Sequence, residues 1–77
     1  MTFNLLDCVV LTREIPEEGL CKGDVGTIVE VYPRDGIEVE FVLESGDTAA
    51  VLSLETSDVR PIANNDLPTV RTMDRTA

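Results

Sequence analysis

The sequence has no histidine and only two cysteines, Cys8 and Cys21. Histidine nitrogen and cysteine sulfur are the usual protein ligands of zinc, and a structural zinc site takes about four of them. This composition argues strongly against a zinc site of the usual ligand types, and we expect no bound metal. The sequence also lacks a nucleophile–base pair and a cofactor-binding loop, so we expect no cofactor and no enzyme activity.

Basic residues are also few. Six lysines and arginines stand against fifteen aspartates and glutamates, which gives a formal net charge of −9. The segment from residue 63 onward carries two acids and two arginines, so the whole excess lies on residues 1–62. A surface this acidic repels nucleic-acid phosphates and anionic lipid headgroups. We therefore expect neither nucleic acid nor a membrane as the direct partner, but a basic protein.

Long apolar runs are missing as well. None comes near the roughly 20 residues that a helix needs to cross a bilayer. The opening MTFNLLDCVV has no basic leader, and Asn4 and Asp7 interrupt its apolar residues, so it does not resemble a signal peptide. We expect a cytoplasmic location, where the reducing environment keeps Cys8 and Cys21 as free thiols.

What the sequence does contain is a series of short apolar runs separated by turn signals. Its 77 residues are enough for one domain. Turn signals such as PRDG and ESGD at short intervals are typical of a small all-β barrel. We predict five strands, with a short 3-10 turn before the last, at residues 7–12, 24–32, 37–43, 48–54 and 59–62. The barrel domain would span residues 1–62, and residues 63–77 would form a flexible C-terminal tail.

The stretch VEVYPRDGIEVEF predicts a hairpin with an unusual outer face. Strand side chains alternate between two faces, so paired residues must share a face. One register pairs Val31 with Val39 in the core. The same register sets Glu30 against Glu40 outside, and a shift of two residues sets Glu30 against Glu38. In either case a glutamate faces a glutamate, which destabilises the pairing by up to about 1 kcal/mol.

The next hairpin has a register that supports itself. A two-residue turn at the Ser-Gly of ESGD makes three apolar pairs, Phe41 with Ala50, Val39 with Leu52 and Ile37 with Leu54. On the outer side this register leaves Val42 opposite Ala49. It also leaves Glu40 opposite Val51 there.

The outer face of these three strands is therefore mixed. An apolar strip, made of Ile28, Val42, Ala49 and Val51, is rimmed by Glu30, Glu38, Glu40 and Tyr32. A contiguous apolar patch usually marks a contact. The contact is either with a partner or with the chain itself. Within the chain, the irregular loop of residues 13–23 offers Ile15 and Leu20, and the tail offers residues 67–70.

Several segments together resemble one known family. The matching elements are Val9-Val10-Leu11, Pro16, Gly19-Leu20, Gly23-Asp24-Val25-Gly26-Thr27, Glu38-Val39-Glu40-Phe41 and Asp58-Val59-Arg60-Pro61. Over about residues 5–62 the chain resembles the small bacterial proteins grouped as domain of unknown function 4926. The resemblance implies a five-stranded SH3-like barrel and carries over no catalytic residues. It also implies a companion encoded beside another small gene, which makes a toxin–antitoxin or immunity pairing a hypothesis.

A looser similarity supplies the alternative. The segment KGDVGTIVEVY is similar to the KOW-type barrels of ribosomal and transcription proteins, which bind RNA with basic loops. Here the segment offers only Lys22 as a base, and its neighbours include Glu14, Glu17, Glu18 and Asp24. A KOW-like nucleic-acid- or ribosome-associated module is the alternative function, with the charge against it.

Four further motifs are better explained by structure than by chemistry. Gly23 and Gly26 lack the Lys and Ser that follow in a phosphate loop, so Gly26 is interpreted as a bend or a close strand crossing. Cys8 lies in an apolar strand, where core packing explains it. Arg60 is expected to pair with an acid of its own domain. The paired glutamates lie on an open face with no pocket to shift a pKa, which argues against catalysis.

We therefore expect a non-enzymatic, acidic protein-interaction module that holds a basic partner, as an antitoxin or immunity protein does. The predicted partner-binding residues are Ile28, Glu30, Tyr32, Glu38, Glu40, Val42 and Val51. A homodimer through the same strip is a close variant. In a homodimer the like-charged rims repel each other unless Arg34 or Arg60 crosses over.

Overall fold

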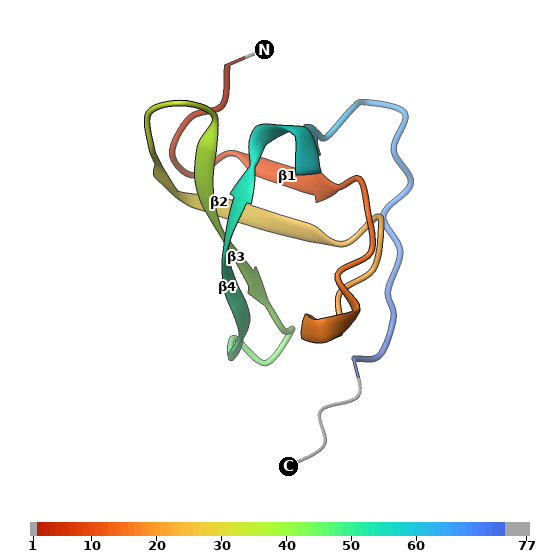
Figure 1. Ribbon diagram of the computed structural model, residues 1–77. Helices are drawn as coiled ribbons and strands as arrows, with labels where there is room; N and C mark the ends of the chain where they lie inside the picture. The colour runs from red at the N-terminus through yellow and green to blue at the C-terminus, as the bar shows by residue number, and fades with distance from the viewer. Residues whose placement is uncertain (1, 74–77) are drawn as a thin grey trace.

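The structure is a computed structural model that describes residues 2–73 of the chain (Figure 1). Its elements are β1 (Cys8–Leu11), η1 (Pro16–Glu18), β2 (Val25–Val31), β3 (Gly36–Val42), β4 (Thr48–Glu55), η2 (Thr56–Asp58) and β5 (Val59–Pro61), where η marks a 3-10 turn. All five predicted strands are confirmed, and each of their ends lies within one residue of the expected position. The predicted 3-10 turn before the last strand is η2.

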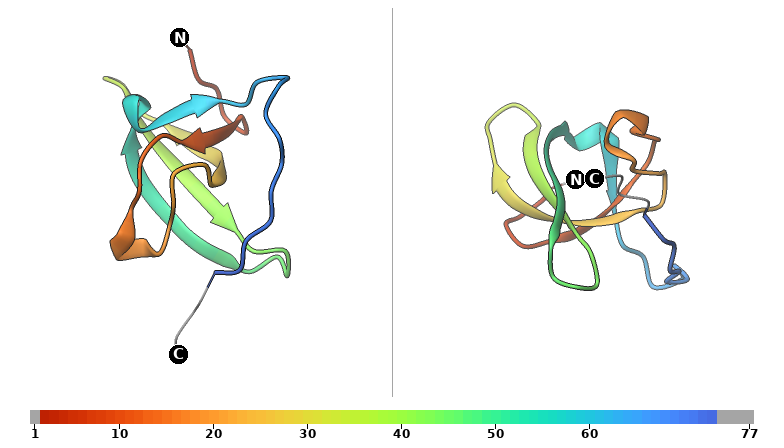
Figure 2. Two further views of the ribbon diagram at one scale, coloured as in Figure 1. Left: turned by 90° about the vertical axis from the view of Figure 1, so that its right-hand side faces the viewer. Right: turned by 90° about the horizontal axis from the view of Figure 1, so that it is seen from below.

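The five strands form one antiparallel sheet in the order β4-β3-β2-β1-β5. The sheet is strongly curved, so that its edge strands β4 and β5 turn toward one another around the core (Figure 2). β4 and β5 are its two edge strands in the described residues, so the sheet is open there rather than a closed barrel. The prediction of an all-β fold with five strands is confirmed, but a closed barrel is not. No helix in residues 2–73 has both the length and the apolar composition to span a bilayer.

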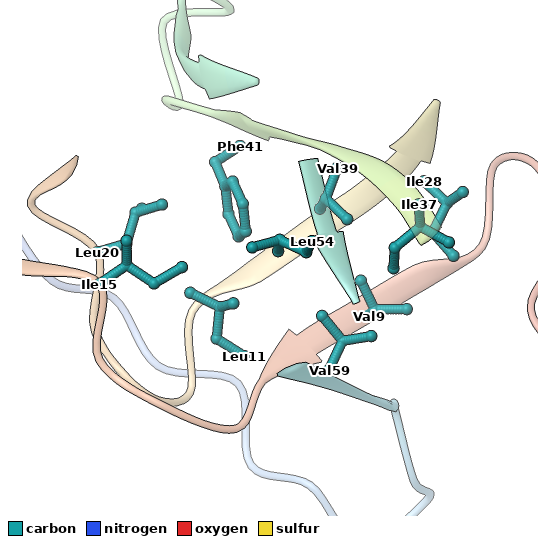
Figure 3. Packing of buried hydrophobic residues seen from close by; sticks show 10 residues of the cluster. All are labelled: Val9, Leu11, Ile15, Leu20, Ile28, Ile37, Val39, Phe41, Leu54 and Val59. Atoms are coloured by element: carbon teal, nitrogen blue, oxygen red, sulfur yellow. The ribbon is translucent and has the colours of Figure 1, made fainter. Parts of the chain in front are cut away.

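The core fills the concave side of the sheet, and every strand contributes to it. The buried cluster consists of Val9, Leu11, Ile15, Leu20, Ile28, Ile37, Val39, Phe41, Leu54 and Val59 (Figure 3). The alternation of side chains along β3 shows why some residues of a strand enter the core and others lie on the outer face. Ile37, Val39 and Phe41 are buried, while Glu38 and Glu40 between them lie on the outer face.

A bulge in β2 decides which of its residues enter the core. Ile28 pairs with Val39. The next matched pair is Glu30 with Glu38, so Val29 is left over and the alternation shifts by one residue. The predicted register that pairs Val31 with Val39 is therefore wrong. The alternative register, which pairs Glu30 with Glu38, is correct between the bulge and the turn. Ile28 is 0% exposed, so its predicted place on the outer strip is also wrong.

The hairpin of β3 and β4 keeps the predicted register over most of its length. The pairs Phe41–Ala50, Val39–Leu52, Ile37–Leu54 and Glu40–Val51 are all confirmed. Near the turn the register shifts, and Val42 pairs with Thr48 rather than with Ala49. The turn is one residue longer than predicted, since Leu43 donates its N–H to the Asp47 carbonyl at 2.9 Å. Ala49 is half-buried and packs against the core cluster, which removes it from the exposed strip.

The loop between β1 and β2 folds back into the core. η1 ends at Gly19, whose positive φ of 71° reverses the chain, and Ile15 then donates its N–H to the Leu20 carbonyl at 2.9 Å. Ile15 and Leu20 are both buried and lie beside Phe41 (Figure 3). The loop therefore closes one end of the core instead of covering the outer strip.

The segment after β5 runs along the outside of the sheet, and we call residues 62–73 the strap. It leaves β5 and runs down one side of the molecule (Figure 2, left). Leu67 and Val70 of the strap are 83% and 101% exposed, so they do not cover the outer strip. Residues 74–77 lie outside the described residues, and the flexibility of the tail stays a prediction.

Candidate functional site

The most unusual feature of the outer surface is a group of carboxylates on β2 and β3. We call Glu30, Glu38 and Glu40, together with the adjoining Tyr32, the acidic face. Glu30 and Glu38 are direct cross-strand partners, so their side chains leave the sheet side by side. Like charges placed opposite each other destabilise a sheet. The predicted meeting of two glutamates is therefore confirmed, with Glu38 as the partner.

Hydroxyl groups orient these carboxylates without neutralising them. Thr48 donates its Oγ1–H to Glu40 Oε2 at 2.7 Å, and Ser53 donates its Oγ–H to Glu38 Oε1 at 2.9 Å. The ion pairs within residues 2–73 lie elsewhere: Arg13–Asp58, Arg60–Asp66 and Arg71–Asp24. The three carboxylates thus have no ion-pair partner within residues 2–73, and they extend from two paired strands.

Tyr32 is the aromatic member of the acidic face and directly follows β2. It is 45% exposed. Partial burial raises the pKa of its hydroxyl, and the negative charges of Glu38 and Glu30 raise it further. The phenol therefore stays protonated and remains a hydrogen-bond donor beside the carboxylates.

Two exposed valines adjoin the carboxylates. Val42 on β3 is 51% exposed and Val51 on β4 is 49% exposed. Val51 pairs directly with Glu40. Six of the seven predicted site residues therefore lie on the outside of β2, β3 and β4, and Ile28 does not. The apolar strip is narrower than predicted because the β2 bulge turned Ile28 inward and Ala49 packs on the core.

Sequence reasoning missed a second apolar row on the same side of the sheet. Val10 pairs with Val25, and Val42 lies on the next strand, so the three valines cross β1, β2 and β3. Val10 points away from the core residues Val9 and Leu11, yet it is only 5% exposed. These valines form one wall of a hollow of about 620 Å³, whose other wall is the strap. Alternation in β1 was the available signal, because VVL places its middle residue on the outer face.

Two arginines fasten the strap at its two ends. Arg60 donates to both carboxylate oxygens of Asp66, at 2.9 and 2.8 Å. The prediction that Arg60 pairs with an acid of its own domain is therefore wrong, because Asp66 lies beyond residue 62 in the predicted tail. Arg71 donates to both carboxylate oxygens of Asp24, which lies 47 residues earlier in the chain. No local pattern signals a contact over that separation, so the sequence alone did not reveal it.

The pKa of Asp66 tests the first of these contacts. Hydrogen bonds from the Arg60 guanidinium and then from the Ala63 N–H lower the pKa of Asp66 from 3.8 to about 2. Because the folded pKa is depressed, the contact stabilises the strap above pH 3.8 and is lost as the pH falls through about 2. In an NMR titration we expect the Asp66 carboxyl to titrate near pH 2 in the wild type. In Arg60→Gln we expect a higher midpoint that stays below 3.8, because the hydrogen bond from the Ala63 N–H remains. Arg34→Gln is the charge-matched control and should leave the titration unchanged. A wild-type midpoint near 3.8 would rule out this contact in solution.

The cysteines and the acids supply no further site. Cys8 is exposed on the outer side of β1, where it pairs with Thr27, so the interpretation of Cys8 as a core residue is wrong. Cys21 is half-buried in the loop, and both thiols are free. Within the described part of the chain, no group of three or more cysteine, aspartate or glutamate side chains is placed to hold a metal ion.

Comparison with known families matches residues 5–61 to the family described as Domain of unknown function (DUF4926). The chain belongs to this family. The resemblance inferred from the sequence is thereby confirmed. Among curated proteins and among solved structures, no match was found.

The features described above lie partly inside and partly outside the matched segment. The DUF4926 segment contains all five strands, the acidic face and Asp24. The strap begins one residue beyond its end. The strap thus lies outside the matched segment and is fastened to a residue inside it.

Proposed function

We propose that this DUF4926 protein is a non-enzymatic module that binds a basic protein through the acidic face and the exposed Val42 and Val51. The single observation that carries the proposal is the pairing of Glu30 with Glu38. This pairing destabilises the sheet, and no arginine or lysine within residues 2–73 forms an ion pair with either carboxylate. A cationic partner would turn this unfavourable arrangement into a favourable one.

The arrangement suits a two-stage association. A net charge of −9 attracts a basic protein over several ångströms and speeds encounter, an effect that salt weakens. On contact, Val42, Val51 and the ring of Tyr32 supply apolar area beside the charges, as interface centres commonly do. Tyrosine is also enriched among the residues that dominate binding energy.

An antitoxin or immunity protein is the form of this module that we favour. Such a protein neutralises a cationic surface by covering it with carboxylates, and three carboxylates on paired strands are suited to that task. A homodimer through the same face is less well supported, because two copies would oppose their own negative charges. We also propose an SH3-like barrel and a cytoplasmic location. The strand order and the η2 turn between the edge strands support the first, and the two free thiols support the second.

The test begins with capture of the partner by the tagged full chain in its native host, followed by purification of that partner. Calorimetry then gives Kd for the wild type and for the double variant Glu30→Lys with Glu40→Lys. A lysine at position 30 would face Glu38, so the fold should tolerate the change. We expect a basic partner, a Kd that rises steeply with salt, and at least a roughly tenfold weaker complex for the double variant.

A matched control is available on η1. Glu17→Lys with Glu18→Lys makes the same change of charge on residues that lie outside the sheet. We expect this control to weaken the complex by less than about threefold, because only the general field changes. Equal losses for the two double variants would refute the acidic face as the binding site. Binding of RNA with a steep salt dependence would instead support the KOW-like alternative.

A further inference from the structure

The loop between β1 and β2 holds a guanidinium group. Arg71 donates its Nε–H to Asp24 Oδ1 at 2.8 Å, and its Nη2 donates both to Asp24 Oδ2 and to the Gly19 carbonyl, the latter at 2.9 Å. We call the Asp24 carboxylate and the Gly19 carbonyl the arginine seat. A planar guanidinium matches three acceptors arranged in this way, and a lysine ammonium does not.

The loop positions the seat through contacts of its own. Cys21 donates its N–H to Asp24 Oδ2 at 2.8 Å, and Asp24 returns its N–H to the Cys21 carbonyl at 3.0 Å. Gly19 adopts a φ of 71°, a conformation that glycine adopts without strain. These contacts lie within six residues of the loop, so the seat does not need Arg71 for its shape.

The strap that supplies Arg71 is held by few contacts. Leu67 and Val70 are exposed, so little apolar area is buried along the middle of the strap. Met73 packs against the core cluster, and the strap is also attached by the Arg60–Asp66 and Arg71–Asp24 ion pairs and by the hydrogen bond from Arg71 to the Gly19 carbonyl. Exposed ion pairs add little to stability. The strap is therefore a segment that a competitor is able to displace.

The space under the strap is suited to such a competitor. The hollow of about 620 Å³ has Val10, Val25 and Val42 on its sheet side, and the seat residue Asp24 also lines it. Ligand sites are mostly apolar with a few placed polar groups, and the sheet side of this hollow has that composition. An extended segment with an arginine and apolar side chains would use both the seat and the valines.

The seat and the strap lie on opposite sides of the end of the family match. Asp24, Gly19 and the three valines all lie within residues 5–61, the part that matches the family. Arg71 lies outside that part. The seat therefore lies within the matched segment, whereas the arginine that fills it lies outside that segment.

We propose that the arginine seat and the valine row form a binding groove for an extended, arginine-bearing segment of the partner, with the strap as an intramolecular competitor. The inference rests on the proposed function in one respect, since it assigns the competing arginine to the basic partner. Regulation follows from the competition, because the partner must displace Arg71 before it fills the seat.

The seat is tested without the partner, by use of a synthetic peptide. The probe is DLPTVRTM, residues 66–73, with blocked ends, added to the full chain carrying Arg71→Gln. We expect saturable NMR shifts at the amides of Gly19 and Asp24. The wild-type chain should bind the same peptide at least roughly tenfold more weakly, because its own strap competes at a high effective concentration.

Two controls isolate the arginine. A peptide with glutamine in place of the arginine should not bind Arg71→Gln measurably, and the chain with Arg34→Gln should bind the original peptide as the wild type does. Equal binding of the two peptides would overturn the seat. Equal binding of the original peptide by the wild type and Arg71→Gln would overturn the competition.

Binding of the purified partner then tests whether the partner occupies the groove. We expect Arg71→Gln to bind the purified partner at least about threefold more tightly than the wild type, because the competing arginine is gone. No gain, or a loss, would overturn that assignment. The two proposals can fail separately. If the peptide binds the seat but the double variant Glu30→Lys with Glu40→Lys binds the partner as tightly as the wild type, the acidic face is refuted and the seat is retained.

Discussion

Replacement of Ile28 by alanine should lower the free energy of unfolding by about 2–5 kcal/mol. Ile28 is fully buried against Val39 at the centre of the core cluster, so the shorter side chain leaves a cavity that rigid strands cannot close. A domain this small has a total stability near the low end of about 5–15 kcal/mol. Urea unfolding followed by circular dichroism should therefore show a variant that is largely unfolded or has a much lower midpoint.

The neighbouring residue provides the control. Val29 lies in the bulge and is 37% exposed, so Val29→Ala should lower the free energy of unfolding by less than about 1 kcal/mol. If Ile28→Ala does not fold at all, Ile28→Val still measures the effect at about 0.5–1.5 kcal/mol. A larger loss for Val29→Ala than for Ile28→Ala would show that the strand has the opposite alternation.

Addition of a single methyl group at Gly26 should lower the free energy of unfolding by about 1–3 kcal/mol. A Cβ there would lie 2.5 Å from Val39 Cγ1 and 2.9 Å from Phe41 Cε1. Both neighbours are packed core side chains, so neither moves without disturbing the rest of the cluster. The urea midpoint of Gly26→Ala should fall while the slope of the transition stays the same.

Gly36 gives the matched comparison for this substitution. A Cβ at Gly36 would lie 3.5 Å from Tyr32 Cβ, an ordinary contact. Gly36→Ala should leave stability unchanged or raise it by up to about 1 kcal/mol, since alanine restricts the unfolded chain. Equal midpoints for the two alanine variants would mean that the close approach at Gly26 is relieved in solution.

Local patterns were sufficient to predict the strands. In β3 the sequence IEVEF alternates apolar and acidic residues, which fixes both the strand and its buried face. The pairing of β3 with β4 followed because only one register brings apolar residues together at three successive positions. The interpretation of Gly26 as a close strand crossing is also confirmed, because the distances above leave no room for a side chain.

The β2 bulge is a feature that alternation cannot predict. Either of two adjacent apolar residues, Ile28 and Val29, fits the inner face when β2 is considered by itself. Packing selects Ile28, which lies opposite Val39, and the extra residue is accommodated as a bulge. This choice moved one of the seven predicted site residues into the core.

The candidate sites differ in how far the sequence revealed them. Every register considered for VEVYPRDGIEVEF set a glutamate against a glutamate, so the acidic face was determined by the residue order itself. The arginine seat was not, because Arg71 and Asp24 are 47 residues apart and each is an ordinary surface residue in its own segment. Side-chain alternation is a local property of the backbone, and the sequence alone therefore determined the strands, the net charge and the acidic face. The seat, the hollow and the inward turn of Ile28 depend on long-range packing, which exists only once the sheet has curved around its core.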